Sequence, residues 1–218
     1  MNGSRNLTHL HPNDVYSVYV SYWQPDPGAT NPEMPGRKAI MTMLIPAKSG
    51  MTCVCASGKT FESCCRQRSY WIPVCVNPDH EGYNKVEIHS AVYSSIDVFL
   101  SRSALAQDRR FRCVDDSDAN PHWLFHNDSP KRFTEYGEIN LGDIELKPDG
   151  RLLVTAMSRA RMSALREILE GPALGLPRPV LTVEAIRRVP KPLSLGDMLP
   201  GIKKASMKAH KIRVPGRN

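Results

Sequence analysis

The sequence contains no long apolar run, and this absence bears on its relation to membranes. The longest such run, residues 39–47, is interrupted by Thr42 and Pro46. It is far shorter than the roughly 20 residues that a membrane-spanning helix needs. The first residues also lack a basic segment followed by an apolar core, so no secretory signal is visible. We therefore expect no membrane contact and a cytoplasmic, reducing location.

The sequence also lacks the short motifs that identify common enzyme classes. The nucleophile elbow, the His-Glu-x-x-His zinc motif, the P-loop and the dinucleotide glycine fingerprint are all absent. An enzyme built on this chain would have to use scattered residues that no local pattern reveals. We expect a non-enzymatic protein and keep an enzyme with an unrecognised site as a second alternative.

The chain does contain a cluster of cysteines. Four of its six cysteines lie in the thirteen-residue stretch CVCASGKTFESCC, namely Cys53, Cys55, Cys64 and Cys65. Four thiolates that meet at one point form a tetrahedral site of soft ligands, which favours Zn²⁺ and leaves no position open for catalysis. Disulfides are the alternative, but they belong to oxidising compartments. The sequence therefore predicts one structural zinc ion.

The residues between the cysteines favour a compact zinc-binding loop. Ser57, Gly58 and Lys59 form a turn sequence in which Gly58 is free to adopt a positive φ. Lys59 can offset the negative charge of four thiolates, and Phe61 is expected to pack beneath the metal as a small core. We call residues 51–67 the knuckle.

The knuckle sequence resembles the SEC-C motif, whose usual form is close to CPCGSGKKFKKCC. The resemblance covers about thirteen of 218 residues and implies that Cys53, Cys55, Cys64 and Cys65 are the zinc ligands. In that family the motif contacts protein and ribosomal partners, so the resemblance implies an interaction role. Ala56 stands where the family usually has Gly, and Glu62 and Ser63 replace a typical basic pair.

The positive charge lies toward the end of the chain. The whole sequence has a formal charge of +7, and residues 187–218 contain nine basic residues against the single acid Asp197. Such a segment is typical of a contact with RNA, DNA or an acidic protein surface, although a solvated tail is the alternative. The candidate nucleic-acid-binding residues are Lys203, Lys204, Lys208, Lys211, Arg213 and Arg217. Because the tail has no aromatic residue, base stacking by the tail itself is not expected.

The remaining pattern predicts an α+β fold with an antiparallel sheet and a few helices. Strands are expected at residues 15–23, 39–45, 70–76, 86–93, 110–114 and 123–126. A helix is expected at residues 96–107, with Ser95 as its N-cap. Residues 139–154 should form a hairpin around Pro148-Asp149-Gly150. A helix with an apolar stripe should follow, capped by Ser158 and ended by Gly171.

Arg159 and Arg161 open this last helix, and together with Ser158 they form a candidate anion-binding site. The alternative is that their charged ends remain in water. Cys75 and Cys113 are expected to be small buried residues.

The sequence suggests four segments: an N-terminal β segment (1–50), the knuckle (51–67), an α+β body (68–186) and a basic tail (187–218). The function it favours is a cytoplasmic zinc protein whose knuckle serves a protein or ribonucleoprotein partner. A nucleic-acid-associated protein anchored by its tail is the first alternative.

Overall fold

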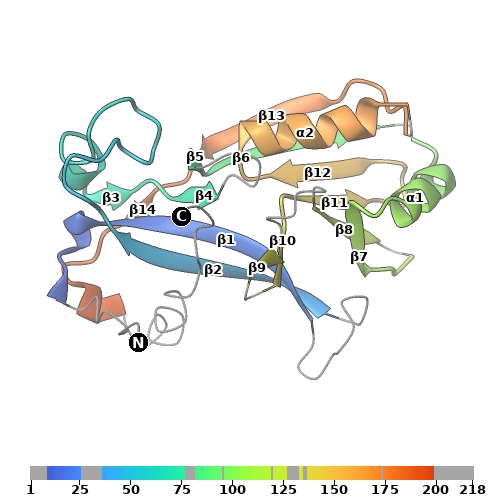
Figure 1. The fold of residues 1–218 in the computed structure, drawn as a ribbon. Helices are drawn as coiled ribbons and strands as arrows, with labels where there is room; N and C mark the ends of the chain where they lie inside the picture. Colours follow the sequence, from blue (N-terminus) through green and yellow to red (C-terminus); the bar gives the residue numbers. More distant parts are fainter. Residues whose placement is uncertain are drawn as a thin grey trace, which may run out of the picture. The chain divides into compact units, whose positions relative to one another are not determined.

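The computed structural model describes residues 9–25, 36–76, 82–94, 96–118, 120–126, 133–134, 137–172 and 174–198. Mixed sheets and two α-helices make up the fold, which confirms the predicted α+β class (Figure 1). The chain divides into two compact units, each built from separate segments. Unit 1 comprises Met1–Val20, Ile40–Val86 and Arg187–Asn218, and unit 2 comprises Ser21–Ala39 and Glu87–Ile186.

Unit 1 holds the knuckle among short strands. The unit 1 part of β1 (Val15–Pro25) pairs in parallel with β4 (Val74–Val76), which pairs antiparallel with β5 (Tyr83–Lys85). Strand β2 (Gly36–Pro46) also pairs with β1, and β3 (Tyr70–Trp71) pairs with β14 (Val189–Pro190). Short 3₁₀ turns in the described part of the unit include η2 (Pro12–Asp14), η3 (Cys65–Gln67) and η5 (Leu195–Met198).

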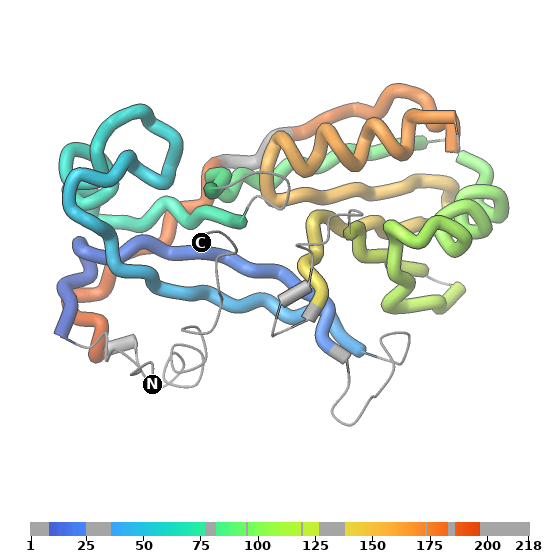
Figure 2. Tube along the Cα trace, viewed as in Figure 1, coloured from blue at the N-terminus to red at the C-terminus, as the bar shows by residue number. Residues whose placement is uncertain are grey.

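A small apolar core joins distant parts of unit 1. Val15, Leu44, Trp71 and Leu195 are buried against one another. The indole N–H of Trp71 donates to the carbonyls of Pro12 and Val15 at 3.0 and 3.1 Å, so this buried polar group is satisfied. The segments that carry Val15 and Leu195 therefore lie side by side, as the blue and red segments of Figure 2 show.

Unit 2 is an antiparallel sheet with one face covered by a helix. Its strand order is β13-β6-β12-β11-β8-β7. The strands are β6 (Glu87–Tyr93), β7 (Phe111–Asp115), β8 (His122–Phe125), β11 (Gly142–Leu146), β12 (Leu152–Ala156) and β13 (Val180–Ile186). Two further strands, β9 (Phe133–Thr134) and β10 (Gly137–Ile139), pair with each other, and β10 pairs with the unit 2 part of β1.

The clearest local prediction, a hairpin followed by a capped helix, is confirmed. Strands β11 and β12 pair in register around the turn at Gly150, whose φ is +77°. The next helix, α2 (Arg159–Glu170), begins at Ser158, whose hydroxyl accepts from the Arg161 N–H. It buries Met162, Leu165 and Leu169 in the core of unit 2. A Cβ at Gly142 would lie 2.9 Å from Leu165 Cδ2, so a glycine in β11 permits this close packing.

Other boundaries differ from the prediction. Helix α1 (Val98–Gln107) starts two residues late because Asp97 caps it, accepting from the Leu100 N–H at 2.9 Å. The predicted cap, Ser95, lies outside the described residues. The strand expected at residues 70–76 is divided into β3 and β4, with Pro73, which has no N–H to donate, between them. Strands β13 and β14 were not predicted.

In the described part of the chain, no helix is long and apolar enough to span a membrane.

Candidate metal centre

The first half of the knuckle is a miniature hairpin. An isolated β-bridge joins Thr52 and Thr60, and the Cys53 N–H donates to the Lys59 carbonyl at 2.8 Å. The turn between them uses two residues with positive φ, Ala56 at +57° and Gly58 at +75°. This confirms the conformation predicted for Gly58. The tight reversal turns Cys53 and Cys55 inward.

The second half is a turn followed by η3. The N–H groups of Cys64 and Arg66 both donate to the carbonyl of Phe61, at 3.2 and 3.0 Å. Phe61 is only 2% exposed, and its ring meets Tyr16 edge-on with the centroids 6.5 Å apart. The predicted small core beneath the cysteines is therefore present. It directs the adjacent Cys64 and Cys65 toward the first pair of thiols.

The four sulfur atoms converge on one point. The Sγ atoms of Cys53, Cys55, Cys64 and Cys65 all lie within 4.8 Å of one another, and all four residues are buried. The Sγ–Sγ distance is 3.4 Å from Cys53 to Cys55 and 3.6 Å from Cys55 to Cys64. A tetrahedral zinc with bonds of about 2.3 Å separates its sulfurs by roughly 3.8 Å. The quartet therefore fits a metal ion, and its members are free thiols rather than disulfides.

Hydrogen-bond donors and cations surround one side of the quartet. The Ser57 hydroxyl donates to Cys64 Sγ at 3.2 Å, and Arg68 Nη2 lies 3.8 Å from the same sulfur. Burial alone would raise the pKa of Cys64, but hydrogen bonds from Ser57 and the neighbouring thiols outweigh it and lower the pKa to about 7. Burial, followed by the hydrogen bond with Cys53, raises the pKa of Cys65. Of the two adjacent cysteines, Cys64 therefore holds a thiolate more readily than Cys65.

The cation beside the sulfurs differs from the one that the sequence suggested. The side chain of Lys59 is exposed, whereas Arg68 approaches Cys64. Lys191 supports the knuckle from far along the chain: its Nζ donates to the Cys65 carbonyl at 2.8 Å and to Asn13 Oδ1 at 2.9 Å. Arg66 pairs with Asp14 at 2.9 Å. No local sequence signal points to Lys191, since its partners lie more than 120 residues earlier.

Part of the predicted basic tail belongs to the folded unit. Arg187, Arg188 and Lys191 lie in or beside β14, within unit 1. The six candidate nucleic-acid-binding residues lie outside the described residues: Lys203, Lys204, Lys208, Lys211, Arg213 and Arg217.

The candidate anion site at the start of α2 does not bring its two arginines to one point. Arg161 is 5% exposed, and its Nη1 donates to the Asn140 carbonyl at 3.4 Å. Arg159 is exposed, and Ser158 uses its hydroxyl to cap the helix. Anion binding at this position stays a prediction.

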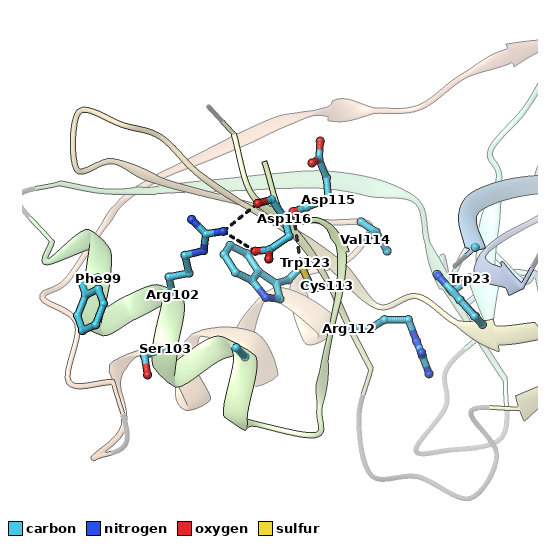
Figure 3. Close-up of a pocket in the computed structure, with 12 residues that line it drawn as sticks. Trp23, Phe99, Arg102, Ser103, Arg112, Cys113, Val114, Asp115, Asp116 and Trp123 are labelled. Atoms are coloured by element: carbon cyan, nitrogen blue, oxygen red, sulfur yellow. Dashed lines mark hydrogen bonds and ion pairs between the residues drawn. The ribbon is translucent and has the colours of Figure 1, made fainter. Parts of the chain in front are cut away.

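Unit 2 contains a cavity of about 630 Å³ beside α1, with Phe99 and Trp23 toward opposite sides (Figure 3). Its arginines are already paired: Arg102 contacts Asp116 at 2.6 Å, and Arg112 contacts Glu138 at 2.9 Å.

The cavity also contains Cys113, which is exposed, so the expectation that Cys113 is buried is wrong. Strand β7, which carries Cys113, is an edge strand of its sheet. Cys75, in contrast, is fully buried as predicted.

Although Cys113 is exposed as a residue, partial desolvation of its thiol, followed by the negative charge of Asp116, raises the pKa of Cys113, which disfavours a reactive thiolate. We assign no reaction to this cavity.

Comparison with protein-family models, with curated proteins and with solved structures found no match for this chain. The function is therefore argued from the geometry of the cysteine quartet and its surroundings.

Proposed function

We propose that the four cysteines bind one structural Zn²⁺ ion and that unit 1, ordered by this ion, is an interaction module for a protein or ribonucleoprotein partner. A single observation carries the proposal. Four buried sulfur atoms lie within 4.8 Å of one another, with two of their separations close to those of a tetrahedral zinc site. The likeness of the knuckle to the SEC-C motif supports the same assignment.

The donor set argues for zinc and for a structural role. Sulfur-only ligation in a tetrahedron favours Zn²⁺ over the harder divalent ions. All four positions are filled by the chain, so no position remains for a substrate or a water molecule. The ion would instead lock Cys53–Cys55 to Cys64–Cys65 and so hold a segment too short to form a core of its own. Thiolate ligands also require a reducing environment, which supports a cytoplasmic location.

The distribution of charge supports an anionic partner. Unit 1 contains fifteen basic and five acidic residues, a formal charge of +10, whereas unit 2 contains fourteen basic and seventeen acidic residues, a charge of −3. The metal-binding unit therefore carries all of the excess positive charge of the protein. A field of this sign attracts nucleic acid or acidic protein surfaces.

Metal content and ligand geometry test the proposal together. We expect one zinc per chain by elemental analysis, released by a strong chelator. Replacement by Co²⁺ should give the intense visible absorption of a tetrahedral thiolate site. A protein purified under reducing conditions that contains no metal, and that fails to take up Co²⁺, would contradict the proposal.

A further inference from the structure

Two tyrosines of unit 1 carry arginine side chains over their rings. The guanidinium carbon of Arg187 lies 4.7 Å from the ring centroid of Tyr19, and that of Arg188 lies 5.1 Å from the ring centroid of Tyr70. Arg68 approaches the Tyr70 ring at 5.7 Å and donates to its hydroxyl at 3.1 Å. Arg187 and Arg188 are neighbours in sequence, so one short segment of chain makes the contacts with both Tyr19 and Tyr70.

These arginines differ from several arginines of unit 2 in how their charge is balanced. In unit 2, Arg102, Arg110, Arg151 and Arg166 each form an ion pair with a carboxylate. Within the described ranges, no carboxylate forms an ion pair with Arg68, Arg187 or Arg188. Arg187 and Arg188 are also exposed. Their positive charge is therefore available to a partner.

A stacked guanidinium has specific binding chemistry. The aromatic ring covers one face of the planar group, while its N–H donors point outward in the plane, where they match the oxygens of a phosphate. Unpaired bases can stack on the guanidinium plane or on a ring face that no arginine covers. We infer that Arg68, Arg187, Arg188, Tyr19 and Tyr70, here named the Arg–Tyr surface, bind single-stranded nucleic acid. This inference rests on the proposed function, because it names the partner of unit 1.

The surface suits a single strand better than a duplex. Base stacking on tyrosine requires bases that are already unpaired.

The Arg–Tyr surface is joined to the metal centre by one side chain. Arg68 contacts Cys64 Sγ through Nη2 and Tyr70 Oη through Nη1. Strand β3, which carries Tyr70, follows η3 after only two residues and pairs with β14. A knuckle closed by metal therefore holds Arg68 and Tyr70 in place, and chelation is expected to weaken nucleic-acid binding.

The test measures binding of the full-length, zinc-loaded protein to a fluorescent single-stranded RNA of about 12 nucleotides, across a range of salt. We expect the double variant Arg187→Gln/Arg188→Gln to bind about tenfold more weakly at 0.1 M salt. Its slope of log affinity against log salt should fall by about 1.4, since each single-strand phosphate contact contributes roughly 0.7. The matched control, Arg102→Gln/Arg151→Gln, makes the same change of charge in unit 2 and should stay within twofold of the parent.

Three outcomes would overturn the inference. In the first, the two double variants lose affinity equally, so that only net charge matters. In the second, Lys203→Gln/Lys204→Gln/Lys208→Gln abolishes binding while Arg187→Gln/Arg188→Gln does not change it. In the third, a duplex of the same sequence binds more tightly than the single strand. Binding of single-stranded DNA is measured in parallel. Equal affinity for RNA and DNA indicates contacts to phosphates and bases, whereas a higher affinity for RNA indicates additional contacts to the 2′-hydroxyl. Either result supports the Arg–Tyr surface.

Zinc content and thermal midpoint are measured on every sample. This separates the inference from the proposed function. A zinc-loaded protein that binds no nucleic acid overturns the Arg–Tyr surface alone. A protein that takes up neither Zn²⁺ nor Co²⁺ but still binds through Arg187 and Arg188 overturns the zinc assignment and leaves the surface standing.

Discussion

The hydroxyl of Ser57 donates a hydrogen bond to the sulfur of Cys64 across 3.2 Å, from the turn that separates the two cysteine pairs. A donor to a ligand sulfur stabilises the thiolate and fixes its orientation. The knuckle therefore contains part of its own support for the metal, in a residue that does not itself bind it.

Ser57→Ala should weaken zinc binding while leaving the four ligands in place. We expect a loss of about tenfold to one-hundredfold in affinity, the range found when the partners of metal ligands are removed. Competition with a chromophoric chelator measures it. Ser63→Ala is the matched control, because Ser63 is exposed and its hydroxyl meets Thr60 rather than a sulfur. Equal losses in the two variants would assign no special role to Ser57.

Cys64→Ser should remove the metal and destabilise the fold. Structural zinc in small sites contributes roughly 10–16 kcal/mol of apparent binding energy, so a large fall in thermal midpoint is expected. A chelator should lower the midpoint of the parent toward that of the variant but leave the variant itself unchanged. Cys113→Ser is the control, since Cys113 is exposed and outside the quartet. A chelator effect of equal size on Cys64→Ser and on the parent would contradict this account.

Ala56→Gly should stabilise the protein. Ala56 has a φ of +57°, and a left-handed conformation costs a residue with a Cβ about 1–2 kcal/mol. The opposite type of substitution at the second position with positive φ, Gly58→Ala, should destabilise the protein by a similar amount. A Cβ at Gly58 would meet no atom within 4 Å, so its φ of +75° alone is responsible. Urea unfolding of the zinc-loaded variants measures both, and opposite signs are required.

Lys191→Met should loosen the knuckle from its support. The ammonium group donates to Cys65, Asn13 and Arg66, and losing bonds from a charged donor costs roughly 1–3 kcal/mol. Hydrogen exchange should increase at the amides of residues 65–68. Lys59→Met removes an equal charge from an exposed position in the knuckle and should have little effect. If Lys59→Met were the more damaging change, the sequence-based role of Lys59 would be restored.

Asp143 in unit 2 should give stability an acid-sensitive component. Its Oδ1 accepts from Lys38 at 2.7 Å and contacts His122 Nε2 at 3.1 Å. Burial alone would raise the pKa of Asp143, but the His122 hydrogen bond and the Lys38 charge outweigh it and hold the pKa below its ordinary 3.8. The stabilisation is complete above that value and is lost as pH falls through the lower pKa of the folded state.

Asp143→Asn should therefore lower the free energy of unfolding by about 1–2 kcal/mol at neutral pH. The difference from the parent should shrink below pH 3.8, and unfolding by denaturant at several pH values measures it. Asp149→Asn is the control: it removes an exposed pair with Arg151, which is worth at most about 1 kcal/mol. Parallel stability curves for Asp143→Asn and the parent would refute the assignment.

The features predicted correctly are those that short stretches of chain determine. The spacing of Cys53, Cys55, Cys64 and Cys65 requires only one hairpin turn and one 3₁₀ turn to bring the sulfurs together. The hairpin of β11 and β12 and the capped helix α2 are likewise local. The four-segment division of the chain stays a prediction.

The features that the sequence did not reveal depend on contacts between distant residues. Composition placed the excess charge in a terminal tail, but the fold collects it in unit 1 and places Arg187 and Arg188 over tyrosines from two earlier strands. It also leaves Cys113 exposed on an edge strand and sets Lys191 against a carbonyl 126 residues away. Local spacing thus determined which four sulfur atoms converge, because neighbouring residues can meet in few ways. Only the tertiary structure decided which side chains support that site and which surface they form, because strand pairing alone brings such separated residues together.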